Sequence, residues 1–327
     1  QVQAEYTELF RADSIIADAE AVREVLLADR ADKRWSTIGQ SFGGFLTLSY
    51  LSFAPQSLRD SRITAGLAPI RTSVDNVYQH TFDRMKERVE EYYSWFPEDA
   101  ELATRIAEHL RTHKEYLPTG ERLTDHRFQM AGHFLGGRWR ERGLHYFLET
   151  AFAEGNDHLS DQFLTAMGAE VTFQANPLYA LMHETIYADG PADGVLPGIP
   201  GYELSPSPAP TNWSAARVAA SRPEFAPDAD RLLFTGEHIF PWYYEEDPSL
   251  RPLAEVANLL AEKKDWGRLY DHAQLHKNEV PVVAAAYNPD VYVDFEHSME
   301  TARWVGNTQV WTSKTHHHDG FGSDPLT

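Results

Sequence analysis

Ser41 is the residue of this chain whose surroundings most clearly indicate chemistry. Residues 39–44 read Gly-Gln-Ser-Phe-Gly-Gly, which contains the pattern G-x-S-x-G. This pattern is typical of a nucleophile elbow, a sharp strand-to-helix turn that exposes a reactive serine at the end of a parallel sheet. The flanking residues agree, because residues 34–38 predict a short buried strand and residues 45–51 predict a helix. The segment therefore indicates a serine hydrolase.

The elbow also makes demands on the residues beside the serine. We expect a side chain at Gly39 or Gly43 to collide with the neighbouring backbone, which explains why small residues stand there. We expect the backbone N–H of Phe42 to donate to an oxyanion, since the residue after the nucleophile does so in this kind of turn.

A serine hydroxyl needs a base, usually a histidine that is oriented by a carboxylate. In chains with this elbow the acid follows a late strand, and the histidine lies in a loop near the C-terminus. Residues 280–287 predict a buried strand, and Asp290 follows it closely. Asp290 is therefore the leading candidate for the acid, Asp294 is the second and Glu296 the third.

Three adjacent histidines lie where the base is expected. Residues 298–305 predict a helix, residues 308–312 predict a last strand, and the loop after it contains His316, His317 and His318. One of these histidines is expected to be the base. A histidine run can also bind metal, but no H-E-x-x-H segment or Cys accompanies this one. We therefore expect no metal and no cofactor.

The order of predicted elements indicates an α/β fold with an inserted helical cap. A helix at residues 13–27 precedes the elbow strand, and residues 62–67 predict the next strand. From Ser73 to about Arg222 the apolar spacing is helical, with a Gly- and Pro-rich loop at residues 190–210. We predict core residues at 1–70, a cap at 71–228 and the rest of the core at 229–327.

Composition excludes several classes of protein. The formal net charge is −20, which disfavours nucleic acid and anionic membrane surfaces as partners. No apolar run is long enough to span a bilayer, and the absence of Cys excludes disulfides and suits a cytoplasmic enzyme. Among the 8 Trp, 15 Tyr and 17 Phe, we expect Tyr146, Phe147 and Trp242 to line an apolar substrate pocket.

Four segments together resemble the proline iminopeptidases, or prolyl aminopeptidases, of the larger actinobacterial type. They are residues 39–44, His183-Glu184, the Gly-Glu-His-Ile-Phe-Pro-Trp segment at 236–242, and His318-Asp319-Gly320. The resemblance covers nearly the whole chain. It implies an α/β-hydrolase fold and an enzyme that removes N-terminal proline from peptides. It also implies the nucleophile Ser41, the acid Asp290 and the base His318.

The resemblance further implies that Glu184 and Glu237 hold the positively charged proline nitrogen of the substrate. Carboxylates in a partly desolvated pocket suit this task, because each charge-assisted hydrogen bond to an ammonium contributes about 1.5–3 kcal/mol. The alternatives are that Glu184 is an ordinary residue on a helix face and that Glu237 caps the end of a strand.

The chain departs from the family pattern before the elbow. The family carries a His/Gln-Gly-Gly-Pro-Gly loop there, which supplies a second oxyanion N–H. No such loop occurs here, and Gly136-Gly137 lies in the helical middle without a following proline. We therefore expect the first strands of the fold and the second oxyanion donor to lie outside residues 1–327.

Two other functions fit the same sequence. One is an esterase or amidase of the same fold that needs no free amine, and the other is an inactive, hydrolase-like binding protein. A complete Ser-His-Asp set argues against the second. Comparing the hydrolysis of a proline amide with that of its N-acylated form distinguishes an aminopeptidase from an esterase or amidase, because only the aminopeptidase should strongly prefer the free amine.

Overall fold

The computed structural model describes residues 1–138, 140–153, 155, 157–190 and 210–323. These residues form two compact units. Unit 1 takes its residues from 1–77, 182–212 and 256–327, and unit 2 takes its residues from 78–181 and 213–255. The predicted domain bounds at residues 70 and 228 are not the bounds of these units and stay a prediction. The predicted loop at 190–210 lies outside the described residues, apart from its two ends.

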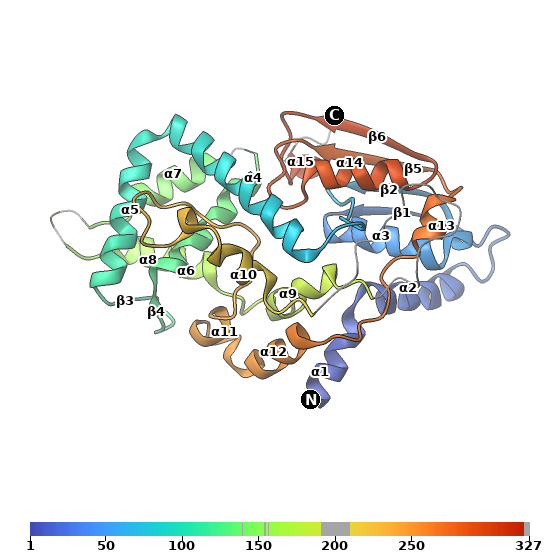
Figure 1. The fold of residues 1–327 in the computed structure, drawn as a ribbon, viewed down its shortest axis with the longest axis horizontal. Helices are drawn as coiled ribbons and strands as arrows, with labels where there is room; N and C mark the ends of the chain where they lie inside the picture. The colour runs from blue at the N-terminus through green and yellow to red at the C-terminus, as the bar shows by residue number, and fades with distance from the viewer. Residues whose placement is uncertain (139, 154, 156, 191–209, 324–327) are drawn as a thin grey trace. The chain divides into compact units, whose positions relative to one another are not determined.

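Unit 1 contains a four-stranded sheet whose strands are all parallel. They are β1 (Trp35–Gln40), β2 (Leu58–Thr64), β5 (Val282–Tyr287) and β6 (Thr308–Ser313), in the spatial order β1-β2-β5-β6. The register pairs Gly39 with Ile63, Ile63 with Ala284, and Ala284 with Val310. Because the strands are parallel, their carboxyl ends meet at one edge of the sheet (Figure 1).

The strands agree with the predicted positions except for the bounds of β2. The prediction that the elbow strand is buried is wrong, because Gly39 is the one buried residue of β1 and Ile38 is exposed. We expected β2 at residues 62–67, but it begins at Leu58 and ends at Thr64. The backbone of Ala65 turns out of the extended region, with a φ of 45°, and this ends the strand.

Helices α3 (Phe42–Phe53) and α14 (Phe295–Trp304) connect neighbouring parallel strands and lie over the sheet (Figure 1). Right-handed connections that progress in one direction along a sheet place their helices on the same face. The core beneath them contains buried apolar residues of both helices, of β2 and β5, and of α2 (Ala12–Leu26). Leu48 and Leu51 of α3 are fully buried in it.

The other helices of unit 1 are short. They are α1 (Val2–Thr7), α13 (His272–His276), α15 (Gly320–Ser323), and the 3₁₀ helices η1 (Glu8–Phe10), η2 (Pro55–Ser57) and η4 (Glu184–Tyr187). In three further helices, some residues belong to unit 1 and the others to unit 2. They are α4 (Val74–Trp95), α9 (Pro177–Met182) and α12 (Ala254–Glu262).

Unit 2 is mainly helical, as expected for the middle of the chain. Its helices are α5 (Pro97–Thr112), α6 (Asp125–Phe128), η3 (Gln129–Gly136), α7 (Glu141–Glu149), α8 (Asp161–Val171), α10 (Ser214–Ala220), η5 (Pro223–Phe225), α11 (Tyr243–Glu246) and η6 (Arg251–Leu253). A small antiparallel pair, β3 (Glu115–Tyr116) and β4 (Arg122–Leu123), is added to them. Aromatic rings fill its interior, where Phe163 packs against Phe128 and Phe147.

None of the helices in the described part of the chain combines the length and the apolar character that crossing a bilayer requires.

Candidate active site

Ser41 lies in the tight turn between β1 and α3, in a backbone conformation that is rare for a residue with a side chain. Its φ is 54° and its ψ is −125°. A Cβ at Gly39 would lie 2.1 Å from the carbonyl oxygen of Gly43, so the predicted collision occurs there. The same prediction is wrong at Gly43, where a Cβ would meet nothing within 4 Å. The second collision would occur at Gly44 instead, where an added Cβ would lie 2.3 Å from the carbonyl oxygen of Gly66.

Backbone hydrogen bonds hold the turn in place. The N–H of Ser41 donates to the carbonyl oxygen of Thr64 at 3.0 Å, and the N–H of Gly44 donates to the Ser41 oxygen at 2.8 Å. Helix α3 begins at Phe42, and the first N–H groups of a helix have no partner within it. The Phe42 N–H is thus positioned at a helix N-terminus directly after Ser41, and its oxyanion role stays a prediction.

Asp290 follows β5, where backbone donors orient its carboxylate. Its own N–H donates to the Tyr287 oxygen at 3.2 Å. Its Oδ1 accepts the N–H groups of Tyr292 at 2.9 Å and Val293 at 3.0 Å. The residue is 1% exposed, so the carboxylate is shielded from water and held in one direction.

His318 lies between Asp290 and Ser41. Its Nδ1 is 2.9 and 3.1 Å from the two oxygens of the Asp290 carboxylate, and its Nε2 is 2.8 Å from Ser41 Oγ. Gln40 fixes the backbone beside it, because its Nε2 donates to the His318 carbonyl oxygen at 3.2 Å. The ring of Tyr292 packs edge-on against the imidazole, with centroids 5.0 Å apart. This arrangement lets His318 accept the Ser41 proton at Nε2 while Asp290 stabilises the imidazolium.

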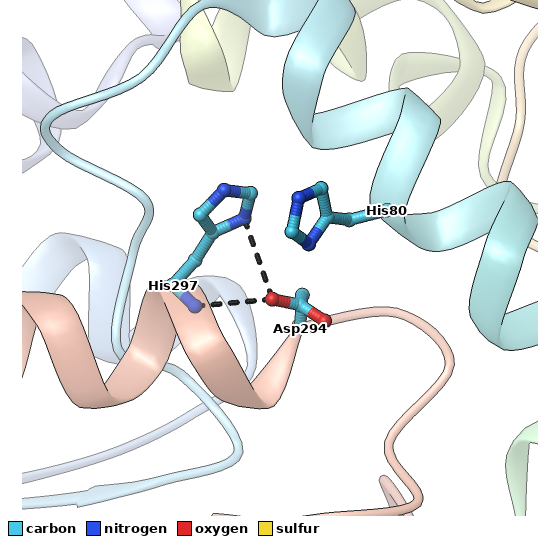
Figure 2. Close-up of side chains that lie close together, drawn as sticks. All are labelled: His80, Asp294 and His297. Atoms are coloured by element: carbon cyan, nitrogen blue, oxygen red, sulfur yellow. Dashed lines mark hydrogen bonds and ion pairs between the residues drawn. The ribbon is translucent and has the colours of Figure 1, made fainter.

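The other two candidates for the acid lie on α14. Asp294 is the N-cap of this helix, and its Oδ1 accepts the N–H of His297 at 3.0 Å (Figure 2, which also draws His80 of unit 2). The same oxygen lies 3.6 Å from Nδ1 of His297. Glu296 is exposed in the first turn of the helix. Asp294 therefore has a structural task at the helix start, whereas Asp290 contacts a histidine that contacts the serine.

The predicted substrate-binding residues are divided between the units. Glu184 is 6% exposed and belongs to unit 1, as do Ser41, Asp290 and His318. Glu237, Tyr146, Phe147 and Trp242 belong to unit 2.

Within unit 2 the three aromatic candidates differ in their surroundings. Tyr146 is exposed, and Trp242 stacks on Phe240 with centroids 5.5 Å apart. Phe147 stacks between Phe134 and Phe163, with centroid distances of 5.7 and 4.6 Å. Their roles, and those of Glu184 and Glu237, stay predictions.

The contacts that hold these groups together could not be read from the sequence. Gln40 was visible only as a variable position of the elbow pattern, and Tyr287 and Thr64 only as strand residues. A polar residue at the last position of a buried parallel strand was the available signal, because such residues face the edge where sites are built.

The chain has an α/β-hydrolase fold. This fold is defined by a parallel sheet and an elbow serine, followed in the chain by an acid and then a histidine that each come after a later strand. No family model matches the chain. It is 41% identical over 323 residues to a proline iminopeptidase of Aeromonas sobria. The aligned residues make up 98% of this chain and 71% of the relative. It is 35% identical to a proline iminopeptidase of Aspergillus aculeatus, covering 97% of this chain and 68% of the relative.

The chain therefore belongs to the proline iminopeptidase family, and it is a hydrolase. A solved α/β-fold family hydrolase from Bacillus anthracis str. Sterne is 14% identical with a TM-score of 0.35, covering 96% of this chain and 70% of that one. So distant a likeness adds nothing to the assignment.

Proposed function

We propose that this protein is a serine aminopeptidase that releases N-terminal proline from peptides through Ser41, His318 and Asp290. The observation that carries the proposal is the position of one imidazole, whose Nε2 lies 2.8 Å from Ser41 Oγ and whose Nδ1 lies 2.9 Å from Asp290 Oδ2. The names of the two relatives support proline as the released residue.

In the proposed reaction, Ser41 Oγ attacks the carbonyl carbon of the N-terminal residue while His318 Nε2 takes its proton. The resulting oxyanion accepts a hydrogen bond from the Phe42 N–H, and Asp290 holds the imidazolium in position. Collapse breaks the C–N bond, His318 gives its proton to the leaving amine, and a prolyl ester on Ser41 remains. Water, deprotonated by His318, then hydrolyses the ester and releases proline.

The substrate amine needs a negative partner, and Glu184 is the candidate in the same unit as the serine. A buried carboxylate stabilises an ammonium through charge-assisted hydrogen bonds that an N-acylated substrate cannot make. Glu237, Tyr146, Phe147 and Trp242 belong to unit 2, and their part in binding peptides remains the prediction drawn from the resemblance.

The test compares a chromogenic proline amide with the same amide acylated on nitrogen, using the full-length protein. An aminopeptidase hydrolyses the free amine far faster, and Ser41→Ala lowers turnover by about a million-fold while leaving the protein folded. Equal rates on both substrates would favour an esterase or amidase. A phosphonate that labels a residue other than Ser41 would contradict the triad.

A further inference from the structure

Tyr287 contacts all three parts of the chain that carry the proposed triad. It is the last residue of β5, it is 4% exposed, and its hydroxyl lies 2.8 Å from the hydroxyl of Thr64. Thr64 is the last residue of β2, and its carbonyl oxygen accepts the N–H of Ser41 at 3.0 Å. The hydroxyl contact therefore joins the end of β5 to the strand end on which the elbow is fixed.

The ring of Tyr287 also lies close to residues before and after His318 in its loop. His316 stacks on it with ring centroids 5.8 Å apart and an interplanar angle of 29°. Beyond His318, a Cβ at Gly320 would lie only 2.7 Å from Cζ of Tyr287, so the backbone of Gly320 is pressed against the ring. The residues two before and two after His318 thus rest on the same side chain.

His316 itself is fixed on this ring. Its Nδ1 lies 2.6 Å from Oγ of Ser313, and Ser313 Oγ also accepts the N–H of His316 at 3.2 Å. This gives the first histidine of the run a structural task of its own. The loop is consequently anchored at the end of β6 and at Tyr287.

The backbone of Tyr287 reaches the third group, because its carbonyl oxygen accepts the N–H of Asp290 at 3.2 Å. We infer that Tyr287 is a positioning residue that sets the separation of His318 from Ser41, and that its hydroxyl contact with Thr64 is the means. The inference rests on the proposed function of Ser41, His318 and Asp290, and it adds a residue that touches none of the reacting atoms.

Physical chemistry supports a neutral, persistent contact. A tyrosine phenol is protonated at neutral pH, and burial raises the pKa of the Tyr287 phenol further, so the hydroxyl can keep its hydrogen bond. In this contact one buried hydroxyl donates and the other accepts, and removing either hydroxyl leaves the other without this partner. Because proton transfer from Ser41 depends on a hydrogen-bond distance, a shift of a fraction of an ångström lowers turnover.

The experiment is a double-mutant cycle in the full-length protein with Tyr287→Phe, Thr64→Val and both together. Each removes one hydroxyl and keeps the size of the side chain. We expect each single variant to lower kcat by roughly ten-fold with KM unchanged, and the double variant to lose no more than either single one. Additive losses, an unchanged kcat, or a change in KM alone would overturn the inference.

Tyr50→Phe is the matched control. Tyr50 is also buried in unit 1, and its hydroxyl bonds Glu20 and, at 2.9 Å, Nε1 of Trp35, away from the triad. It should lose stability to a similar degree while kcat per folded molecule stays at the wild-type value. If Tyr287→Phe does not fold, Thr64→Val alone tests the inference. A lower kcat with unchanged KM supports the positioning role, and an unchanged kcat or a change in KM alone overturns it.

Labelling separates this inference from the function on which it rests. Phosphonate labelling of Ser41 in the wild type, together with an unchanged kcat in Tyr287→Phe, refutes the positioning role alone. Labelling of another residue in the wild type refutes the triad itself.

Discussion

Gln40 donates its Nε2–H to the carbonyl oxygen of His318 at 3.2 Å, so the residue before the proposed nucleophile holds the residue proposed as its base. The bond is exposed, and such a bond contributes about 0.5–1.5 kcal/mol. We predict that Gln40→Ala lowers kcat by roughly two- to ten-fold and lowers the free energy of unfolding by no more than this bond contributes. Gln40→Glu should be impaired at least as much, because a carboxylate cannot donate to a carbonyl. Wild-type kinetics in both variants would contradict this.

The second prediction distinguishes the two aspartates. Asp290→Asn should lower kcat by roughly 10⁴-fold, because an amide favours the wrong tautomer of His318. Asp294→Asn should keep most activity, since Asn caps a helix about as well as Asp. Steady-state kinetics on a proline amide, with circular dichroism to check folding, decide between them. The reverse order of losses would move the acid to Asp294.

The third prediction uses two glycines of the same short helix. A Cβ at Gly320 would lie 2.7 Å from Tyr287 Cζ and 3.0 Å from His316 Cβ, whereas a Cβ at Gly322 would meet nothing within 4 Å. Gly320→Ala should therefore displace the loop of His318 and lower kcat by about ten-fold or more. Gly322→Ala is the control and should behave as wild type. Equal kinetics for the two variants would show that the loop tolerates the shift.

The fourth prediction concerns recognition of the substrate amine. Glu184→Gln removes the charge and keeps the shape of the side chain, so kcat/KM for a free-amine substrate should fall by roughly ten- to 150-fold. Hydrolysis of an N-blocked ester should barely change. Glu296→Gln, which alters an exposed glutamate of the same unit, serves as the control. Equal losses on both substrates would make Glu184 a structural residue.

The fifth prediction concerns pH and the stability of unit 2. Burial of His126 opposes protonation, but its hydrogen bonds with Asp125 and Glu246 outweigh this and raise the pKa of His126 to about 9. The ring also packs against Trp242, with centroids 4.3 Å apart. Because the pKa of His126 is higher in the folded than in the unfolded state, its protonation stabilises the folded protein. This stabilisation is fully present below about pH 6.5 and is lost as pH rises through about 9.

The expected loss is about 2 kcal/mol in the free energy of unfolding, after a discount for the partly exposed ring. Urea unfolding of the full-length protein at pH 6.5 and 9.5 measures it. His126→Gln should flatten this part of the pH dependence. A pH dependence that is identical in wild type and variant would refute the assignment.

Much of the architecture near the elbow followed from local pattern. The elbow pattern placed β1 before Ser41 and α3 after it, and the predicted β5 and β6 agree with the observed bounds within two residues. β5 is readable from its apolar run, whereas β1 and β6 contain several exposed residues and were read from their places before the elbow and after the predicted helix at residues 298–305. The end of β2 was not readable, since it depends on a positive φ at Ala65 that nothing in the residue type announces.

The sequence by itself determined the types of the reactive groups and their order: an elbow serine, then an acid after a late strand, then a histidine. The residues alone left three acids and three histidines open, the resemblance named Asp290 and His318 among them, and only the tertiary structure decided the distances between these groups. His318 lies 2.8 Å from Ser41 although 277 residues separate them, and Asp294 caps a helix while Asp290 bonds His318. The contacts of Tyr287 with Thr64, His316 and Gly320 were equally invisible. Such distances depend on how strands pair across the sheet, and strand register is a property of the whole fold rather than of any local segment.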